Sequence, residues 1–172
     1  MIVMPQFIKN DPEKLADYIA AIGRGLIAFD GRPSAGKTPL ARDMARRLGC
    51  TAVDADKFLE QQQGAFVEKL RIADMRRTIE AGGPLVLLSG VCARRVIERL
   101  ELPAAAFVWV EWASLVRLDQ MCRDFFEYDE GAGIPSKHPL YKEVQAYIDT
   151  YDARRRPDVI YMNTYEKDLP IE

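Results

Sequence analysis

The sequence predicts an α/β fold of three layers, in which a five-stranded parallel sheet is covered by helices on both faces. Three observations support this prediction. Short apolar segments of strand length alternate with segments in which apolar residues recur at helical spacing. Several of the strand segments are almost continuously apolar, which is typical of parallel strands buried on both faces. Each connection between strands is about as long as one helix, as parallel neighbours require.

The composition is that of a globular domain and argues against several classes of protein. The chain has 172 residues, of which 48% are hydrophobic and 29% charged, so we expect one domain over residues 1–172. A net charge of −2 gives no overall basic field, and we therefore expect neither a nucleic-acid partner nor an anionic membrane surface. The apolar start is too short for a signal-peptide core, and no run approaches the roughly 18 to 20 apolar residues of a membrane span. We expect a cytoplasmic protein.

The first predicted helix covers residues 13–22. Asn10 or Asp11 followed by Pro12 is typical of a helix start, because an acceptor side chain caps the first turn and proline suits the first helical position. Gly23 is expected to end the helix. Its apolar stripe is expected to pack against the rest of the domain rather than to bind a partner.

A strand predicted for residues 26–30 leads directly into a motif of the pattern G-x-x-x-x-G-K-[ST]. The motif consists of Gly31, Arg32, Pro33, Ser34, Ala35, Gly36, Lys37 and Thr38. Backbone N–H groups in such a turn form an anion-binding concavity, and the helix predicted after it points its positive dipole end at the same place. Lys37 would then reach the β- and γ-phosphates of a nucleotide, and the Thr38 hydroxyl would ligate Mg²⁺. The alternative is a glycine turn between a strand and a helix, without a ligand.

A second short strand, predicted for residues 50–54, carries an acidic pair at its carboxyl end. Asp54 and Asp56 point the same way if the strand continues, because side chains alternate along a strand. Ligands of open α/β sheets bind beyond the carboxyl ends of the strands, so two carboxylates would face one spot beside the phosphates. Alternatively, Asp56 caps a helix that begins near Lys57, and Asp54 is a turn residue.

The remaining segments continue the alternation. The predicted strands cover residues 84–89, 104–111 and 158–162, and the predicted helices cover 65–81, 91–100, a stretch that begins near Ser114, and 141–151. Residues 125–139 contain glycine, proline and mixed charge, which predicts a loop. Asn163 and Thr164 follow the last strand and are candidates, by position alone, for contact with the nucleotide base.

With these elements placed, the chain resembles the P-loop small-molecule kinases, and most closely the uridine kinase-like nucleoside kinases. Residues 26–38 look like that group's first strand and phosphate loop. Residues 53–58 are similar to its second strand, where an aspartate faces the hydroxyl to be phosphorylated. Residues 117–124 are similar to its lid helix, and residues 147–160 to its closing helix and final strand. The resemblance implies the three-layer P-loop NTPase fold, with a lid segment around residues 117–140.

The resemblance also implies roles for single residues. Arg117 and Arg123 of the lid helix would approach the transferring phosphoryl group. Their separation of six positions does not place them on one helix face, and ordinary surface arginines are the alternative. Shikimate and gluconate kinases carry a similar D-x-D. By that analogy Asp54 would hold Mg²⁺, directly or through water, and Asp56 would orient or deprotonate the acceptor hydroxyl. The sequence does not decide which aspartate has which role.

Two residues depart from the pattern of these kinases. Ser89 stands before Gly90 at the end of the third predicted strand, where uridine kinases commonly have an acidic residue. Pro39 follows the phosphate-loop threonine, where the family usually donates a backbone N–H to the α-phosphate, and proline has none. The loss of one such charge-assisted hydrogen bond costs about 1.5–3 kcal/mol where nothing replaces it.

The sequence supports two hypotheses of different classes. The first is an ATP-dependent phosphotransferase that phosphorylates a hydroxyl of a small molecule, a nucleoside such as uridine or a similar metabolite. The second is a nucleotide-binding module without phosphotransfer, which Pro39 and Ser89 motivate. Nucleic-acid binding through residues 154–156 is a weaker third hypothesis, because these arginines lack interleaved aromatic residues. The acceptor, the base preference and the oligomeric state stay open.

Overall fold

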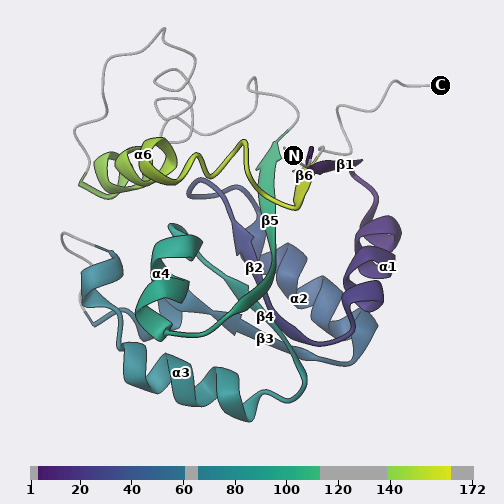
Figure 1. The fold of residues 1–172 in the computed structure, drawn as a ribbon, viewed down its shortest axis with the longest axis horizontal. Helices are drawn as coiled ribbons and strands as arrows, with labels where there is room; N and C mark the ends of the chain where they lie inside the picture. Colours follow the sequence, from purple (N-terminus) through teal and green to yellow (C-terminus); the bar gives the residue numbers. More distant parts are fainter. Residues whose placement is uncertain (1–3, 61–65, 113–138, 164–172) are drawn as a thin grey trace, which may run out of the picture.

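In a computed structural model of the chain, six parallel strands form one sheet in the order β1-β6-β5-β2-β4-β3. The structure describes residues 4–60, 66–112 and 139–163 (Figure 1). The strands are β1 (Gln6–Lys9), β2 (Gly25–Asp30), β3 (Thr51–Asp54), β4 (Leu85–Ser89), β5 (Ala104–Trp112) and β6 (Val159–Asn163). All five predicted strands are present. The α/β class and the parallel sheet are therefore confirmed.

The prediction of five strands is wrong, because β1 adds a sixth at the edge of the sheet. This strand has four residues and pairs only with β6. Ile8 alone is buried in it, since one face packs on the core while the other faces solvent. A strand with a single buried residue has too little alternation of apolar and polar residues to be recognised in the sequence.

Helices cover both faces of the sheet, and the three predicted layers are present. The α-helices are α1 (Pro12–Ile22), α2 (Lys37–Leu48), α3 (Ile72–Ala81), α4 (Ala93–Leu100) and α6 (Pro139–Tyr151). Figure 1 shows α1 and α2 on one side of the sheet, α3 and α4 on the other, and α6 above α4. None of the helices in the described residues is long and apolar enough to cross a membrane.

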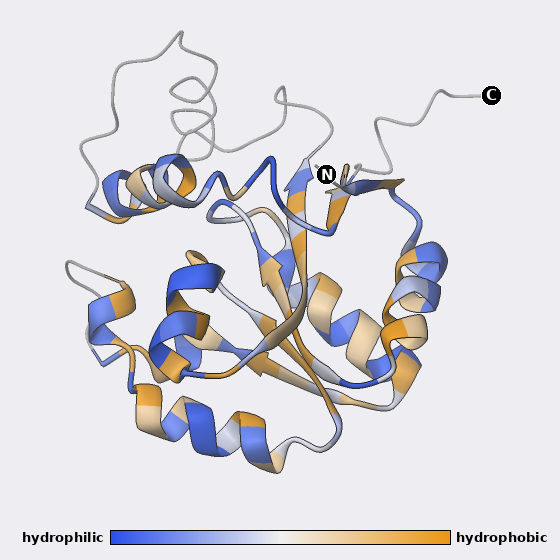
Figure 2. Cartoon of the chain, in the orientation of Figure 1, coloured by the Kyte–Doolittle hydropathy of each residue, from blue (hydrophilic) through white to orange (hydrophobic). Residues whose placement is uncertain are grey.

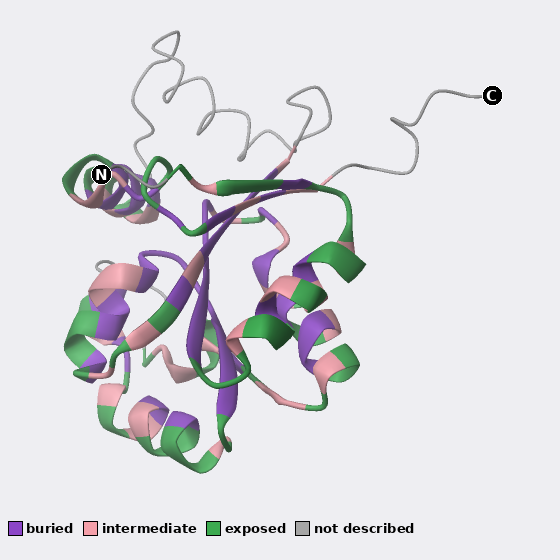
Figure 3. Cartoon of the chain, turned by 45° about the vertical axis from the view of Figure 1, so that its right-hand side comes forward, coloured by how far each residue is buried: buried purple, intermediate pink, exposed green. Residues whose placement is uncertain are grey.

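Two hydrophobic clusters hold these layers together, one on each face of the sheet. Leu26 and Ala28 belong to the cluster that contains buried side chains of α3, α4 and α6. Ile27 and Phe29, which alternate with them along β2, belong to the cluster under α1 and α2. Figure 2 shows the apolar colour concentrated on the strands and on the inner sides of the helices. Figure 3 shows buried residues concentrated on the central strands, and every residue of β4 and all but the first of β2 are buried. The continuous apolar runs therefore reflect burial on two faces.

The predicted ends of the first helix are confirmed by its capping contacts. The Asp11 side chain accepts a hydrogen bond of 2.9 Å from the backbone N–H of Lys14, and Pro12 is the first helical residue. Gly23 ends the helix at a φ of 74°, a conformation that favours glycine. The helix predicted for residues 65–81 is instead divided into a 3₁₀ helix, η2 (Val67–Lys69), and α3.

The helix predicted for 141–151 begins two residues earlier, at Pro139, so residues 139 and 140 belong to α6. Proline suits the first turn of a helix, because its missing N–H has no partner there. The remainder of the predicted lid segment, up to residue 138, lies outside the described residues.

Because the strands are parallel, their carboxyl ends lie together at one edge of the sheet. β2 lies between β4 and β5, and the chain leaves it towards β3 through α2 but later returns on its other side as β5. Such a reversal leaves a crevice beyond the carboxyl ends of the strands, which is where ligands bind in open α/β sheets. The residues at these ends are Asp30, Asp54, Ser89, Trp112 and Asn163.

Candidate functional site

The phosphate-loop motif joins the end of β2 to the start of α2, as the sequence predicts. Gly31 has a φ of 147°, and a Cβ added there would lie 2.4 Å from the carbonyl oxygen of Val110 in β5. Gly36 precedes the helix at a φ of 87°. Within the described residues, no side chain makes a capping hydrogen bond at the N-terminus of α2. The positive end of that helix therefore faces the concave side of the loop, where an anion is favoured.

Lys37 and Thr38 are held in position by contacts inside the site. The Lys37 side chain is only 7% exposed and donates to the carbonyl oxygen of Arg32 in the same loop. The hydroxyl oxygens of Thr38 and Ser89 are 3.0 Å apart and share a hydrogen bond. Ser89 thus occupies the place at the end of β4 where an acidic residue is common in uridine kinases, and it contacts the predicted Mg²⁺ ligand.

Two side chains from neighbouring strands hold the outer part of the loop. The indole N–H of Trp112, at the end of β5, donates to the Ser34 carbonyl oxygen at 2.9 Å. The side-chain amide of Asn163, at the end of β6, donates to the Ala35 carbonyl oxygen, also at 2.9 Å. A Cβ on Gly36 would lie 2.9 Å from that Asn163 amide nitrogen. Asn163 is therefore a support of the phosphate loop, and its role toward a base stays a prediction.

Asp54 and Asp56 do not follow the expected strand geometry. β3 ends at Asp54, and a 3₁₀ helix, η1 (Ala55–Phe58), begins immediately after it. The Asp54 side chain accepts a hydrogen bond of 3.2 Å from the backbone N–H of Asp56, so it caps this helix. The strand does not continue to Asp56, which is the condition for both carboxylates to point the same way, because the capping bond turns the backbone away from the strand direction. The alternative of a turn at Asp54 applies, with Asp54 rather than Asp56 as the capping residue.

The same turn still lies beside the phosphate loop. β3 pairs with β4 so that Asp54 is opposite Ser89, whose hydroxyl contacts Thr38. A Cβ added to Gly90 would lie 2.8 Å from the Cβ of Ala55, so glycine permits this close approach of β4 and η1. The acidic turn and the predicted Mg²⁺ ligand therefore occupy one corner of the sheet edge.

The two aspartates differ in their surroundings. The second carboxylate oxygen of Asp54 accepts a hydrogen bond of 3.2 Å from Arg42 of α2, and its side chain is only 15% exposed. Asp56 is more exposed and has no such arginine partner among the described residues. Desolvation by the surrounding protein and then the Asp54 carboxylate raise the pKa of Asp56, while Lys37 opposes that rise. A raised pKa favours proton acceptance near neutral pH.

A buried carboxylate that the sequence analysis assigned no role lies at the entry to the phosphate loop. Asp30 is 3% exposed and accepts hydrogen bonds from the backbone N–H groups of Gly31, at 2.8 Å, and Ala93, at 3.3 Å. Its other oxygen accepts a hydrogen bond from the hydroxyl of Tyr147. Burial raises the pKa of Asp30, and these three hydrogen bonds act in the opposite direction. Burial and the nearby carboxylate also raise the pKa of Tyr147, so its hydroxyl stays protonated and donates.

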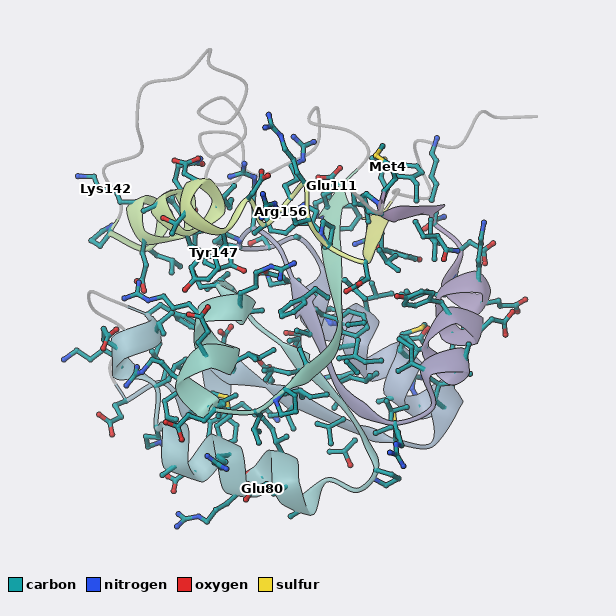
Figure 4. All side chains as sticks on the ribbon, viewed as in Figure 1. Met4, Glu80, Glu111, Lys142, Tyr147 and Arg156 are labelled. Carbon is teal, nitrogen blue, oxygen red and sulfur yellow. The ribbon has the colours of Figure 1, made fainter. Side chains whose placement is uncertain are left out.

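Helix α6 supplies further contacts to both sides of the site. Gln145 accepts a hydrogen bond of 3.4 Å from the Arg32 guanidinium. Glu143 accepts hydrogen bonds from the backbone N–H groups of Phe66 and Val67, at the start of η2. Figure 4 shows Tyr147 on the side of α6 that faces the sheet, whereas Lys142 points away from it. One helix therefore contacts the phosphate loop and also the segment that follows the acidic turn.

The structure brings most of the predicted site together. Residues 31–38, Asp54 and Asp56 lie at one edge of the sheet. Arg117 and Arg123 lie outside the described residues, so their role stays a prediction. Sequence reasoning missed the roles of Asp30 and Tyr147. A signal existed for Asp30 alone, because an acidic residue ending a buried strand directly before a phosphate loop needs a partner.

The donor set fits a nucleotide and Mg²⁺ better than a metal held by protein alone. Among the described residues, no group of three histidine, cysteine or carboxylate side chains is arranged to hold a metal ion. Mg²⁺ is commonly bound by one or two protein ligands together with substrate phosphates. The Thr38 hydroxyl, beside Ser89 and near Asp54, suits that mode.

Comparisons with known proteins support the fold. No protein family model matches the chain, and no curated protein matches it. The structure of a possible uridine kinase from Bacillus stearothermophilus aligns with a TM-score of 0.55 and 15% sequence identity, over 87% of this chain and 96% of the other. Shikimate kinase from Acinetobacter baumannii, in complex with shikimate, aligns with a TM-score of 0.47 and 18% identity, over 86% and 87% of the two chains. The fold expected from the resemblance is shared with the possible uridine kinase, at low sequence identity.

Proposed function

We propose that this chain is an ATP-dependent phosphotransferase that transfers a phosphoryl group to a hydroxyl of a small molecule, a nucleoside such as uridine or a similar metabolite. The observation that carries the proposal is the corner formed by β3, β4 and the phosphate loop. There Thr38 contacts Ser89, and Ser89 lies opposite Asp54 in the sheet, so groups suited to a nucleotide and groups suited to an acceptor alcohol adjoin. A nucleotide-binding site without an acceptor needs at most one carboxylate here, to contact Mg²⁺, and gives no role to the second.

Phosphoryl transfer requires charge neutralisation and alignment rather than covalent chemistry by the protein. Lys37 is the first group for this role. Its ammonium now bonds the Arg32 carbonyl oxygen inside the loop, and phosphate oxygens at the same concavity are stronger acceptors for it. The Thr38 hydroxyl would be a ligand for Mg²⁺, which would neutralise charge on the β- and γ-phosphates. Ser89 shares a hydrogen bond with that hydroxyl and holds its oxygen in place.

The surroundings of the two aspartates suggest a division of roles that the sequence left open. Both oxygens of Asp54 already accept hydrogen bonds, from the Asp56 N–H and from Arg42. Asp54 is therefore suited to hold the turn and to contact Mg²⁺ through water. Asp56 has the raised pKa and the greater exposure, and we assign it the acceptor hydroxyl. It accepts the proton of that hydroxyl as the new P–O bond forms and the bond from the γ-phosphorus to the bridging oxygen breaks, which releases ADP. Arg117 and Arg123 remain our proposed groups for the γ-phosphoryl oxygens.

Pro39 bears on the affinity for the nucleotide. It lies in the first turn of α2, where its missing N–H does not disturb the helix, and the next N–H, that of Leu40, bonds the Gly36 carbonyl oxygen at 3.1 Å. The α-phosphate therefore lacks the donor that usually follows the phosphate-loop threonine. We expect weaker nucleotide binding than in a kinase with an N–H at this position. The second candidate function, nucleotide binding without transfer, rests on this observation.

The experiment is a screen of Mg²⁺-dependent ADP release from ATP, with nucleosides, sugar acids and small alcohols as acceptors. The Lys37→Ala variant is the negative control, because it lacks the ammonium group that is proposed to contact the phosphates. Acceptor-stimulated release that disappears in this variant supports the phosphotransferase and identifies the acceptor class. Binding of ATP without stimulation by any acceptor supports the second candidate.

Paired substitutions test the acidic turn once an acceptor is found. Asp56→Asn is expected to lower kcat by about 100-fold or more, as removal of a general base does, while ATP affinity changes little. Asp43→Asn is the matched control, because Asp43 is a carboxylate on α2 that pairs with Arg46 and Arg47 and not with the site. An active enzyme in which neither Asp54→Asn, Asp56→Asn nor their combination has an effect contradicts the assignment.

A further inference from the structure

We infer that Tyr147 of α6 is a positioning residue for the phosphate loop, and that it acts through Asp30. The inference deepens the proposed function and rests on the nucleotide-binding part of it. It concerns a hydroxyl that is buried beneath the loop. Tyr147 is 3% exposed and belongs to the hydrophobic cluster on the α4 side of the sheet.

The hydrogen bonds around Asp30 connect three elements at one point. One carboxylate oxygen accepts from the N–H of Gly31, the first residue of the loop, and from the N–H of Ala93, the first residue of α4. The other oxygen accepts from the Tyr147 hydroxyl. The Tyr147 oxygen in turn accepts a hydrogen bond of 3.2 Å from the N–H of Arg94. The carboxylate thus has three donors, and Tyr147 supplies the only one from a side chain in the described part of the chain.

Removal of the Tyr147 hydroxyl therefore leaves one oxygen of a buried carboxylate without its donor. A buried charge in that state moves toward water or toward another donor, because desolvation is costly. Candidate donors are the backbone N–H groups that Asp30 already holds, the N–H of Arg94 that loses its acceptor, and the Lys37 ammonium, whose charge also acts on this carboxylate. Either movement disturbs the loop, since Gly31 lies so close to β5 that an added Cβ would meet the Val110 carbonyl oxygen, and Lys37 bonds inside the loop.

A second contact from the same helix reaches the same loop. Gln145 accepts a hydrogen bond from the guanidinium of Arg32, the second residue of the motif. Arg32 is 4% exposed, so this contact is buried as well. The first two residues of the loop are thus each connected to α6, one through Asp30 and one directly. No comparable pair of contacts joins α6 to the acidic turn within the described residues, since Glu143 bonds the later residues 66 and 67.

The test compares Tyr147→Phe with Tyr151→Phe, which removes the same atom from the same helix. Tyr151 donates to Glu98 of α4 and not to the loop, and its ring lies 5.0 Å from that of Tyr147. Both variants keep their rings, so packing is preserved in each. The probes are Mg·ADP and inorganic pyrophosphate, with affinity measured by calorimetry. Tyr147→Phe is expected to weaken both affinities by about 5- to 30-fold, and Tyr151→Phe by less than about 2-fold.

A double substitution tests whether Tyr147 acts through Asp30. Asp30→Asn keeps an acceptor for the Gly31 and Ala93 amides but removes the buried charge. In that background the further change Tyr147→Phe is expected to weaken pyrophosphate binding by less than about 3-fold, because no carboxylate then loses a donor. Equal effects of Tyr147→Phe in both backgrounds would show that its hydroxyl does not act through Asp30, and would overturn the inference.

Hydrogen exchange of the protein without ligand gives a readout that does not depend on nucleotide binding. Exchange of amides in residues 31–36 is expected to accelerate about 5- to 100-fold in Tyr147→Phe and to stay at the wild-type rate in Tyr151→Phe. Equal exchange in the two variants overturns the inference.

The wild-type protein distinguishes failure of the proposed function from failure of this inference. If it binds pyrophosphate but phosphorylates no acceptor, the phosphotransferase is contradicted, and the affinities of the two variants still test the role of Tyr147. If the wild-type protein binds neither probe, the proposed function is contradicted, and the role of Tyr147 is then tested by the hydrogen-exchange comparison alone.

Discussion

The phosphate loop and the acidic turn lie at the same edge of the sheet, but they are held very differently. The loop receives hydrogen bonds from Trp112 and Asn163 at its outer part, and its entry is fixed by Asp30 and Tyr147. The acidic turn is held by the capping bond of Asp54, by its ion pair with an exposed arginine, and by hydrogen bonds from Arg71 to the carbonyl oxygens of Lys57 and Phe58. The loop is thus fixed by side chains that are distant in the sequence, whereas the turn is held mainly by residues near it in the chain.

The largest effect is expected from Gly31→Ala, because this substitution disrupts the close packing of the phosphate loop against β5. A Cβ at this position would lie 2.4 Å from the Val110 carbonyl oxygen, and the φ of 147° is unfavourable for alanine. Backbone must move to accept the methyl group, and we expect a loss of about 2–4 kcal/mol in the free energy of unfolding. Denaturant unfolding measures this loss.

The matched control for that substitution is Gly49→Ala. Gly49 also has a positive φ, 63°, but nothing lies within 4 Å of its Cβ position. Only the cost of the left-handed conformation applies, about 1 kcal/mol. Equal losses in the two variants would mean that close packing of the loop against β5 contributes nothing.

A smaller effect is expected from Gly90→Ala, which tests the contact between β4 and the acidic turn. The added methyl group would lie 2.8 Å from the Cβ of Ala55, so the backbone of β4 or of η1 must shift, but Gly90, unlike Gly31, has no positive φ that adds to the cost. We expect a loss of about 1–2 kcal/mol and a weaker response to the acceptor, with ATP affinity almost unchanged. An equally large loss of ATP affinity would show that the two regions are not independent.

A still smaller effect is expected from Arg42→Gln, which removes the ion pair of Asp54. The Arg42 side chain is 56% exposed, and such pairs contribute at most about 1 kcal/mol. Arg46→Gln, which removes a pair with Asp43 on the same helix, is the control. Thermal unfolding of both variants should lie close to that of the wild type. A loss above about 2 kcal/mol for Arg42→Gln alone would show that the turn is more tightly held than its contacts indicate.

The pH dependence of stability should report on Asp56, and this is the smallest effect. Its pKa is raised above the ordinary value of 3.8, so the folded state disfavours the ionised carboxylate relative to the unfolded chain. The native state is therefore destabilised by this group at neutral pH, and the penalty disappears as the pH falls through the raised pKa toward 3.8. Asp56→Asn should unfold at a slightly higher temperature than the wild type at pH 7, and the difference should shrink toward pH 4. A variant that is less stable at pH 7 contradicts the direction of this shift.

The difference between the phosphate loop and the acidic turn also explains how much of the site could be predicted from the sequence. The phosphate loop was found because its pattern is local, and because an apolar strand and an amphipathic helix flank it within residues 26–48. Its supports could not be found in this way. Tyr147 is 117 positions from Asp30, and Asn163 is 128 positions from Ala35, so only the folded sheet brings them together.

The acidic turn shows a different limit. The pair was located correctly at the end of a strand, but its geometry was wrong, because the Asp54 side chain ends the strand by capping η1. Aspartate competes with the strand for backbone N–H groups, and the sequence does not show which wins. The edge strand β1 was missed for a related reason, since one buried residue in four gives no period.

The most direct test of the central claim is phosphorus NMR of a mixture of ATP, Mg²⁺, the enzyme and an acceptor identified in the ADP-release screen. Phosphotransfer predicts that a new phosphate-monoester resonance grows as that of the ATP γ-phosphate declines, and that it is absent with Lys37→Ala. The appearance of inorganic phosphate alone, or of no change while ATP is bound, would contradict the account and would favour a nucleotide-binding module.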